Sequence, residues 1–187
     1  MNFPLAPQTD PSGCFALIPE PERDRIRIAR IAPPSGEHID HRVCGLRPGA
    51  GPIQLLFHPE LPVIFVANAG NSTVAACHWD CAAGHASFAQ AIGTVPPMFT
   101  AANTVTGIAL APSGRYLYAA NRGHDSVSLF AIQRGKGKLF VRMREMLPAA
   151  PSGPPMLDAS GTLLTLPGPA GPMRFAIQPA NGTLTRA

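Results

Sequence analysis

The sequence predicts an all-β protein made of repeated four-stranded units, which is the arrangement of a β-propeller. The first observation is an internal repeat: residues 59–74 (PELPVIFVANAGNSTV) are matched without a gap by residues 112–127 (PSGRYLYAANRGHDSV). A repeat period of roughly 50 residues is typical of propellers and solenoids. The second observation is that 18 glycines and 22 prolines stand among 187 residues, which suits a chain with many turns. The third is that short apolar runs lie between these turns without the spacing of an amphipathic helix.

Four copies of the repeat divide the chain into blade-like units that together form one domain. Each copy has an apolar run, a tight turn, a second run, a polar turn and an alternating third run in the same order. The tight turns are anchored at Gly13, Leu61, Gly114 and Gly161. The units cover about residues 1–47, 48–99, 100–148 and 149–187.

The third unit shows the predicted strands most clearly. Its apolar runs are rich in Val, Ile, Leu, Phe and Tyr and are bounded by Gly, Pro, Asn and Ser, which is the pattern of strands. The predicted strands are 106–110, 116–120, 126–132 and 138–143. A single four-stranded sheet cannot bury both of its faces, so neighbouring units must stack on one another. This requirement predicts a partial propeller of about four blades.

Composition and charge exclude several classes of protein. A hydrophobic fraction of 45% with 14% charged residues argues against disorder. No apolar stretch approaches the ~20 residues of a membrane span, and the N-terminus lacks a basic region followed by an apolar core. The net charge of +4 is scattered, and over residues 24–30 arginines alternate with apolar residues, which predicts a solvated sheet face. We therefore expect a cytoplasmic protein with no nucleic-acid or membrane partner.

Two clusters contain residue types that bind metals. Residues 77–81 (CHWDC) hold two thiols, an imidazole and a carboxylate, but no second ligand pair stands at a matching place. Residues 37–41 (EHIDH) would place His38 and Asp40 on one strand face and turn His41 away. The four cysteines lack the spacing of a disulfide framework. We expect free thiols, no metal and no cofactor.

Residues 121–125 (NRGHD) form the most informative polar group. They lie where the second strand of the third unit turns into the third strand. Arg122 could hold a carboxylate or phosphate bidentately, and His124 could transfer protons near neutral pH. The alternative is that the Asn and Asp at the two ends only cap a tight turn, as Asn68 does in the second unit. The second unit has Ala-Gly-Asn where this one has Arg-Gly-His, which argues against turn capping alone and leaves both interpretations open.

Several motifs carry a resemblance to a known family. They are 48–52 (PGAGP), 57–59 (FHP), 103–104 (NT), 112–118 (PSGRYLY) and 121–126 (NRGHDS). Together they resemble the lactonase family of seven-bladed β-propellers, which includes the propeller-type 6-phosphogluconolactonase and the fungal carboxymuconate cyclase. The resemblance runs in register over almost the whole chain. It implies hydrolysis of a sugar lactone, such as 6-phosphogluconolactone, at the polar mouth of the central channel.

The resemblance also implies roles for four residues. His124 would be the catalytic base, and Arg122 would hold the anionic group of the substrate. Asn103 and Asn121 would bind the substrate beside them. The implied partner is a small-molecule sugar lactone.

The chain departs from the family pattern on inner strands and channel loops. At these places family members carry an Arg-His pair, a Glu, an acidic residue followed by a His, and a Pro-Arg-x-Phe segment. This chain has instead Ile53, Gln54, Ala69, Gly107, Ala109 and the segment 152–155 (SGPP). Opening a lactone needs a base and a group that stabilises the oxyanion. Because each departure removes an ionisable side chain, we expect weak or absent lactonase activity.

Four units are present where the resembled family has seven. An incomplete ring leaves strand edges and blade faces uncovered. These observations predict either a truncated homologue or self-association through open blade edges. Two alternative functions follow, a non-catalytic protein-interaction module and a non-functional gene fragment.

Overall fold

The computed structural model describes residues 6–187, which form four antiparallel sheets of four strands each. The first sheet contains β1 (Gln8–Thr9), β2 (Phe15–Glu20), β3 (Arg25–Ala32) and β4 (Glu37–Gly45). The second contains β5 (Pro52–Phe57), β6 (Val63–Asn68), β7 (Thr73–Asp80) and β8 (His85–Gly93). The third contains β9 (Thr104–Leu110), β10 (Tyr116–Arg122), β11 (Ser126–Ile132) and β12 (Leu139–Met146). The fourth contains β13 (Met156–Leu157), β14 (Leu163–Leu166), β15 (Met173–Ile177) and β16 (Leu184–Arg186).

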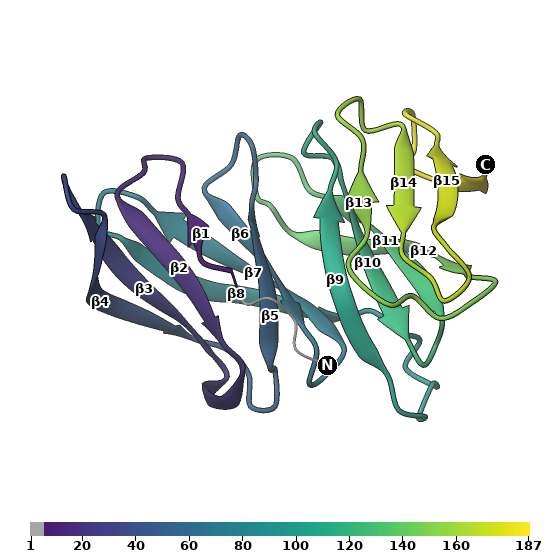
Figure 1. The fold of residues 1–187 in the computed structure, drawn as a ribbon, viewed down its shortest axis with the longest axis horizontal. Helices are drawn as coiled ribbons and strands as arrows, with labels where there is room; N and C mark the ends of the chain where they lie inside the picture. Colours follow the sequence, from purple (N-terminus) through teal and green to yellow (C-terminus); the bar gives the residue numbers. More distant parts are fainter. Residues whose placement is uncertain (1–5) are drawn as a thin grey trace.

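The sheets stand side by side in chain order, from the purple first sheet to the yellow fourth (Figure 1). Within each sheet consecutive strands pair, so every blade is an up-and-down meander. Among the described residues the helical element is a single 3-10 turn, η1 (Pro21–Arg23), and no helix is long and apolar enough to cross a membrane. The predicted all-β partial propeller is confirmed.

Three hydrophobic cores lie between the blades, one at each junction of neighbouring sheets. Buried side chains from both sheets form each core, and Phe65, Tyr118 and Phe130 are fully buried. The first junction includes Leu17, Ile26, Ile28, Ile64, Val66 and Trp79. The second includes Phe65, Val74, Ile108, Leu117, Phe130 and Leu139. The third includes Tyr118, Leu129, Leu164, Phe175, Ile177 and Leu184. Burial of a large apolar side chain stabilises by ~1.5–3 kcal/mol, so stacking of blades supplies the main stabilising contacts.

The turn before the third strand has the same backbone conformation in the first three blades. Asp24, Ser72 and Asp125 have φ values of 49°, 53° and 49°. Each of their carbonyl oxygens accepts a hydrogen bond from the residue that follows the fourth strand. The donors are the N–H groups of Leu46, Thr94 and Leu147, each at 2.8–2.9 Å. The repeat read from the sequence is therefore a repeat of backbone geometry, because left-handed conformations favour small polar residues.

The turn between the first two strands also joins neighbouring blades. His58 is buried, and its Nδ1 accepts hydrogen bonds from the N–H groups of Glu60 (3.0 Å) and Leu61 (2.9 Å). Its Nε2 must then carry the proton, which it donates to the carbonyl oxygen of Gly114 at 2.9 Å. A Cβ at Gly114 would lie 2.6 Å from His58 Cε1. The His-Pro motif of the second blade thus holds the glycine turn of the third.

The outward face of the first blade carries the alternating arginines. Glu20 contacts Arg25 at 2.5 Å and Arg27 at 3.3 Å, and Arg27 contacts Asp40 at 2.6 Å. The hydrogen bond from Arg25 lowers the pKa of Glu20. These side chains are partly exposed and form an ion-pair cluster on the face of this blade that points away from the second blade, beside the exposed Val43 that lies opposite Arg27.

The fourth blade is shorter than the other three. Residues 184–186 form its fourth strand and pair with β15. The Gly- and Pro-rich segment 167–172 links β14 to β15. Tyr118 of the third blade donates a hydrogen bond to the carbonyl oxygen of Gly182 at 2.9 Å, which fastens the fourth blade. Burial raises the pKa of this phenol.

Candidate functional site

The connection between β10 and β11 presents the two predicted catalytic residues. Arg122 is the last residue of β10 and lies opposite Thr104 at the start of the inner strand β9. His124 follows after Gly123, whose Cβ would lie 2.2 Å from the carbonyl oxygen of Ala102. Only glycine therefore allows this turn to pack against the segment that leads into β9. Both Arg122 and His124 are half-buried.

The two predicted substrate-binding residues lie in one hydrogen-bond network below this turn. Asn121 is fully buried, and its Nδ2 donates to Ser126 Oγ and Ser128 Oγ, both at 3.3 Å. Its Oδ1 accepts from Thr94 Oγ1 at 2.5 Å and from Asn103 Nδ2 at 3.3 Å. Asn103 is partly exposed. Through Thr94, which follows β8, the network joins the second blade to the third. Both the Oδ1 and the Nδ2 of Asn121 are engaged in these hydrogen bonds.

The network also orients His124. Asn103 Oδ1 accepts a hydrogen bond from the backbone N–H of His124 at 3.1 Å. The imidazole Nδ1 lies 2.7 Å from Ser126 Oγ. The ring of Phe99 meets the imidazole edge to face, with centroids 4.7 Å apart and an interplanar angle of 88°. When Nδ1–H donates to Ser126, Nε2 carries the lone pair that can take a proton.

The loop that carries Phe99 is held from below by Arg144. This loop, residues 94–103, connects β8 to β9. Arg144 on β12 donates from Nε to the carbonyl oxygen of Thr94 at 3.0 Å and from Nη2 to that of Val95 at 3.2 Å. Ser128 Oγ donates to the same Thr94 carbonyl. Burial lowers the pKa of Arg144. A cation bound by backbone carbonyls thus anchors the loop against the third blade.

The inner strands bear neutral side chains at positions where the resemblance described above led us to expect charges. Gln54 spans two blades: its Nε2 donates to the carbonyl oxygen of Ile108 at 3.1 Å, and its Oε1 accepts from the N–H of Ile108 at 2.8 Å. At Gly107 on β9 a Cβ would lie 2.5 Å from Pro154 Cβ and 2.8 Å from Gln54 Oε1. This position therefore has no room for an acidic side chain. Ile53 and Ala109 are buried in the blade cores.

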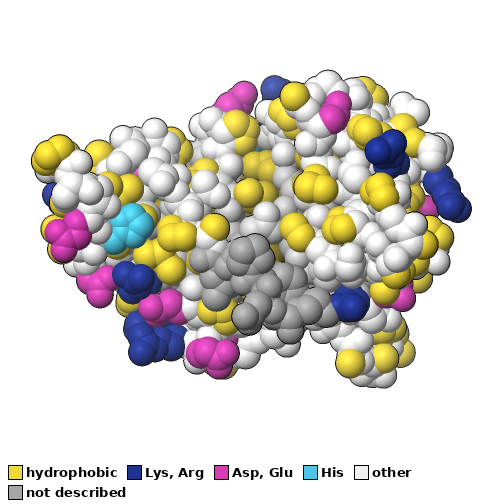
Figure 2. Space-filling view, viewed as in Figure 1, with side chains coloured by type: hydrophobic (Ala, Val, Ile, Leu, Met, Phe, Trp, Pro, Cys, Tyr) yellow, Lys and Arg dark blue, Asp and Glu magenta, His cyan; other side chains and the backbone are white. Residues whose placement is uncertain are grey.

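Two cavities follow the inner strands, and among the described residues that line them none has an ionisable side chain. They extend along β5 and β9, with volumes of about 520 and 240 Å³. In Figure 2 most charged side chains on the visible face lie towards the two ends of the molecule. The two cavities along the inner strands therefore do not supply the charged groups of the candidate site, which come from residues 121–125.

The glycine-rich turn of residues 48–52 is a structural clamp. The carboxylate of Asp24 accepts hydrogen bonds from the N–H groups of Gly49 (2.7 Å) and Gly51 (2.8 Å), and these bonds lower the pKa of Asp24. A Cβ at Gly70 would lie 2.4 Å from the carbonyl oxygen of Gly49. The N–H of Ala69 donates to Gly51. The turn packs so closely on Ala69 and Gly70 that its glycines are explained by backbone contact.

The two metal-like clusters point their side chains apart. Cys77 is buried in the first blade junction, whereas Cys81 is exposed. The hydrogen bond that the Cys77 thiol shares with the neighbouring Cys44, together with burial, raises the pKa of Cys77. Asp40 pairs with Arg27 on one face of β4, while His41 stacks on Phe15 at 5.4 Å on the other, as the strand alternation predicted. All four cysteines are free thiols, and no group of three metal-ligating side chains occurs among residues 6–187.

Four meandering sheets stacked through apolar cores define a β-propeller, with a polar site on the connections of its third blade. The chain belongs to the lactonase family of seven-bladed β-propellers, because the family model described as "Lactonase, 7-bladed beta-propeller" matches residues 6–164.

Two relatives show how much of the family's length is present. The chain is 34% identical over 92 residues to a 6-phosphogluconolactonase of Bacillus subtilis (strain 168), covering 49% of this chain and 26% of that protein. It is 25% identical over 167 residues to a 6-phosphogluconolactonase of Yersinia pseudotuberculosis serotype O:3 (strain YPIII), covering 88% of this chain and 49% of that protein. The chain therefore spans a quarter to a half of the length of these relatives.

Solved structures show the same fold. A protein from Lactobacillus plantarum superimposes with a TM-score of 0.91 at 21% identity, covering 97% of this chain and 53% of its own. The periplasmic gluconolactonase of Pseudomonas aeruginosa superimposes with a TM-score of 0.87 at 20% identity, and the match covers 96% of this chain and 51% of that protein. At these identities the likeness establishes the propeller architecture.

No role was predicted from the sequence for Thr94, Phe99 or Ser126, although Ser126 ends the motif 121–126. Ser126 directly follows the NRGHD motif and aligns with Thr73 of the second blade, which bonds Asn68 at 3.0 Å. The repeat therefore contained a signal for the role of Ser126. Thr94 and Phe99 lie in a blade connection without a repeated pattern, and only the stacking of two blades brings them to the site.

Proposed function

We propose that this chain hydrolyses a phosphorylated sugar lactone, such as 6-phosphogluconolactone, at the connection between β10 and β11. Membership of the lactonase family supports the reaction class. The observation that carries the proposal is the orientation of His124 by Ser126, Asn103 and Phe99, two positions along the chain from the guanidinium of Arg122. A base and a cation are the minimum needed to activate water and to hold a negative charge.

The chemistry assigns one step to each nitrogen of His124. With Nδ1–H donating to Ser126, Nε2 removes a proton from water while the water oxygen attacks the lactone carbonyl carbon. The carbonyl oxygen becomes an oxyanion. When the tetrahedral intermediate collapses, the ring C–O bond breaks, and the proton on Nε2 passes to the departing alkoxide. The products are the open-chain carboxylic acid and the regenerated neutral imidazole.

Arg122 is assigned to the anionic group of the substrate. A guanidinium binds a phosphate or carboxylate through two parallel hydrogen bonds, which fixes orientation as well as charge. Asn103 lies close enough to the surface to contact a substrate. Asn121, which is fully buried and bonded at both ends of its amide, takes the role of a positioning residue.

The site also explains why we expect a low rate. In hydrolases with a histidine base, a carboxylate stabilises the imidazolium that forms during the reaction. Here the partner of Nδ1 is the neutral hydroxyl of Ser126, and the inner strands supply no further ionisable side chain around their cavities. The proposed activity is thus a slow hydrolysis above the spontaneous rate.

The test is acid release from 6-phosphogluconolactone, followed in a pH-stat against the rate without protein. The wild-type chain should exceed the spontaneous rate, and His124→Ala and Arg122→Ala should each return it to that background. His85→Ala, an exposed histidine on β8, is the matched control and should leave the rate unchanged. A wild-type rate equal to background, or a rate unaffected by both site variants, would overturn the proposal.

A further inference from the structure

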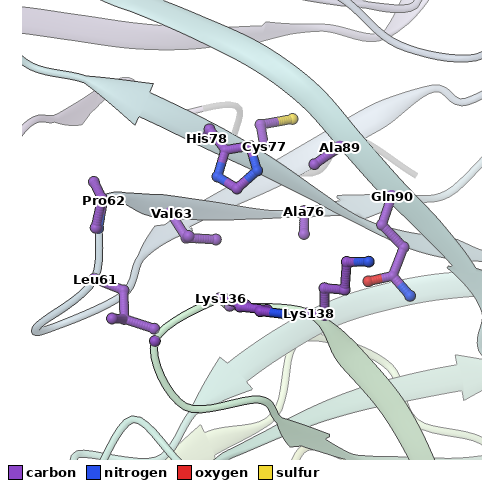
Figure 3. Close-up of a pocket in the computed structure, with 12 residues that line it drawn as sticks. Leu61, Pro62, Val63, Ala76, Cys77, His78, Ala89, Gln90, Lys136 and Lys138 are labelled. Atoms are coloured by element: carbon purple, nitrogen blue, oxygen red, sulfur yellow. The ribbon is translucent and has the colours of Figure 1, made fainter.

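A separate cavity of about 240 Å³ lies between the second and third blades, away from the candidate site. The hairpin turn between β11 and β12, residues 133–138, closes it against strands β6, β7 and β8 (Figure 3). A Cβ at Gly137 would lie 2.5 Å from Val63 Cγ2, so glycine allows the hairpin to approach the second blade this closely. The cavity therefore forms where the β11–β12 hairpin of the third blade packs on the sheet of the second blade.

One wall of the cavity is fixed by hydrogen bonds between blades. Gln90 on β8 donates from Nε2 to the carbonyl oxygen of Leu139 at 3.0 Å, and its Oε1 accepts from the N–H of Leu139 at 2.9 Å. Leu139 itself is fully buried in the second junction. Both ends of the Gln90 amide are thus used to join the sheets, and the cavity is preformed.

The floor and the rim of the cavity differ in chemistry. Leu61, Val63 and Ala76 supply an apolar floor. The side chains of its lining that can carry a positive charge are Lys136, Lys138 and His78, and no Asp or Glu is among the described residues of that lining. In Figure 3 His78 on β7 and Lys138 on the third blade approach the space over Ala76 from opposite sides. A compact apolar space with cationic groups at its edge is complementary to an amphipathic anion.

We propose that this inter-blade cavity binds a small organic monocarboxylate with a compact apolar body, such as a single ring. The apolar body would lie on Val63 and Ala76, and the carboxylate would face the ammonium groups of Lys136 and Lys138. The volume lies below the ~300 Å³ at which drug-sized ligand pockets begin, so the occupant is smaller than a nucleotide. The proposal is independent of the lactonase reaction, because the cavity shares no residue with the candidate site.

Calorimetric titration at low ionic strength with benzoate tests the proposal. Benzoate should bind saturably, whereas benzamide, which lacks the charge, and acetate, which lacks the ring, should bind at least about tenfold more weakly, as expected for loss of one charge-assisted contact or of the apolar burial. Lys138→Gln and Lys136→Gln should each weaken benzoate binding by roughly tenfold. Arg174→Gln, an exposed cation on β15, is the control and should have no effect.

A second variant tests whether benzoate binding requires the cavity itself or only the positive charge of the surface. Ala89 is exposed and lines the cavity, so Ala89→Leu should fill part of it without touching the cores. Benzoate affinity should fall in this variant while the thermal unfolding midpoint stays unchanged. Absence of saturable benzoate binding, equal affinity for benzamide, or binding that persists unchanged in Lys138→Gln and Ala89→Leu would each overturn the proposal.

Discussion

Replacement of His58 tests whether hydrogen bonds between turns hold the second and third blades together. In His58→Ala the N–H groups of Glu60 and Leu61 lose their acceptor, and the carbonyl oxygen of Gly114 loses its donor. The ring is buried at 6% exposure, so water does not fully replace these bonds. The variant should therefore be destabilised even though the residue is far from the candidate site.

The magnitude follows from three lost hydrogen bonds. Each hydrogen bond contributes ~0.5–1.5 kcal/mol to the free energy of unfolding, and a buried donor or acceptor left without a partner costs more than the average hydrogen bond contributes. We expect the free energy of unfolding to fall by about 2–4 kcal/mol. His85→Ala, at an exposed position, should change it by less than about 0.5 kcal/mol.

Urea unfolding followed by the fluorescence of Trp79, the single tryptophan and a buried one, measures this difference. A double-mutant cycle with Gly114→Ala sharpens it. The added methyl would meet His58 Cε1 at 2.6 Å, and Gly114 has a φ of 65°. Without the imidazole only the backbone strain remains, so the two changes should be less than additive. A loss below about 1 kcal/mol for His58→Ala, or strict additivity in the cycle, would refute the reasoning.

Two further predictions concern the clamps found in the first and second blades. The N–H groups of Gly51 and Gly49 lower the pKa of Asp24 in the folded state. As the pH falls, the Asp24 carboxylate is therefore protonated in the unfolded state at a higher pH than in the folded state. This contribution is complete above the ordinary value of 3.8 and is lost as the pH falls through the lower folded value. Asp24→Asn should make urea stability fall less steeply below about pH 4, and an unchanged slope would contradict the assignment. Gln54→Leu leaves the N–H and the carbonyl of Ile108 unpaired and should cost about 1–3 kcal/mol by urea unfolding; a neutral effect would show that water replaces both bonds.

The positions of the strands could be predicted because they depend on local pattern. The predicted strand 126–132 matches β11, and the other three predicted strands of the third unit fall largely within β9, β10 and β12. The turn anchors Gly13, Gly114 and Gly161 all have φ between 65° and 74°. The three residues of the short β16 carry too little apolar pattern to indicate a strand from the sequence.

The candidate site could be located but not explained from the sequence. The NRGHD motif placed Arg122 and His124 on one turn, because they are neighbours in the chain. The motif did not indicate the partners of His124, which the structure shows to be Ser126 and Phe99. Asn121 was expected to contact substrate, yet it is buried among hydroxyl groups, because the loop after β8 packs over it.

The sequence by itself determined the repeat, the all-β class, the order of strands and turns, and membership of the propeller family. These properties are periodic and local, so they are written in the spacing of apolar, glycine and proline residues. Only the tertiary structure decided how Gln54 holds Ile108, why Gly107 has no room for a carboxylate, and how Gln90 holds Leu139. Each of these contacts joins two blades at residues about 50 positions apart, and such contacts exist only once the blades have stacked.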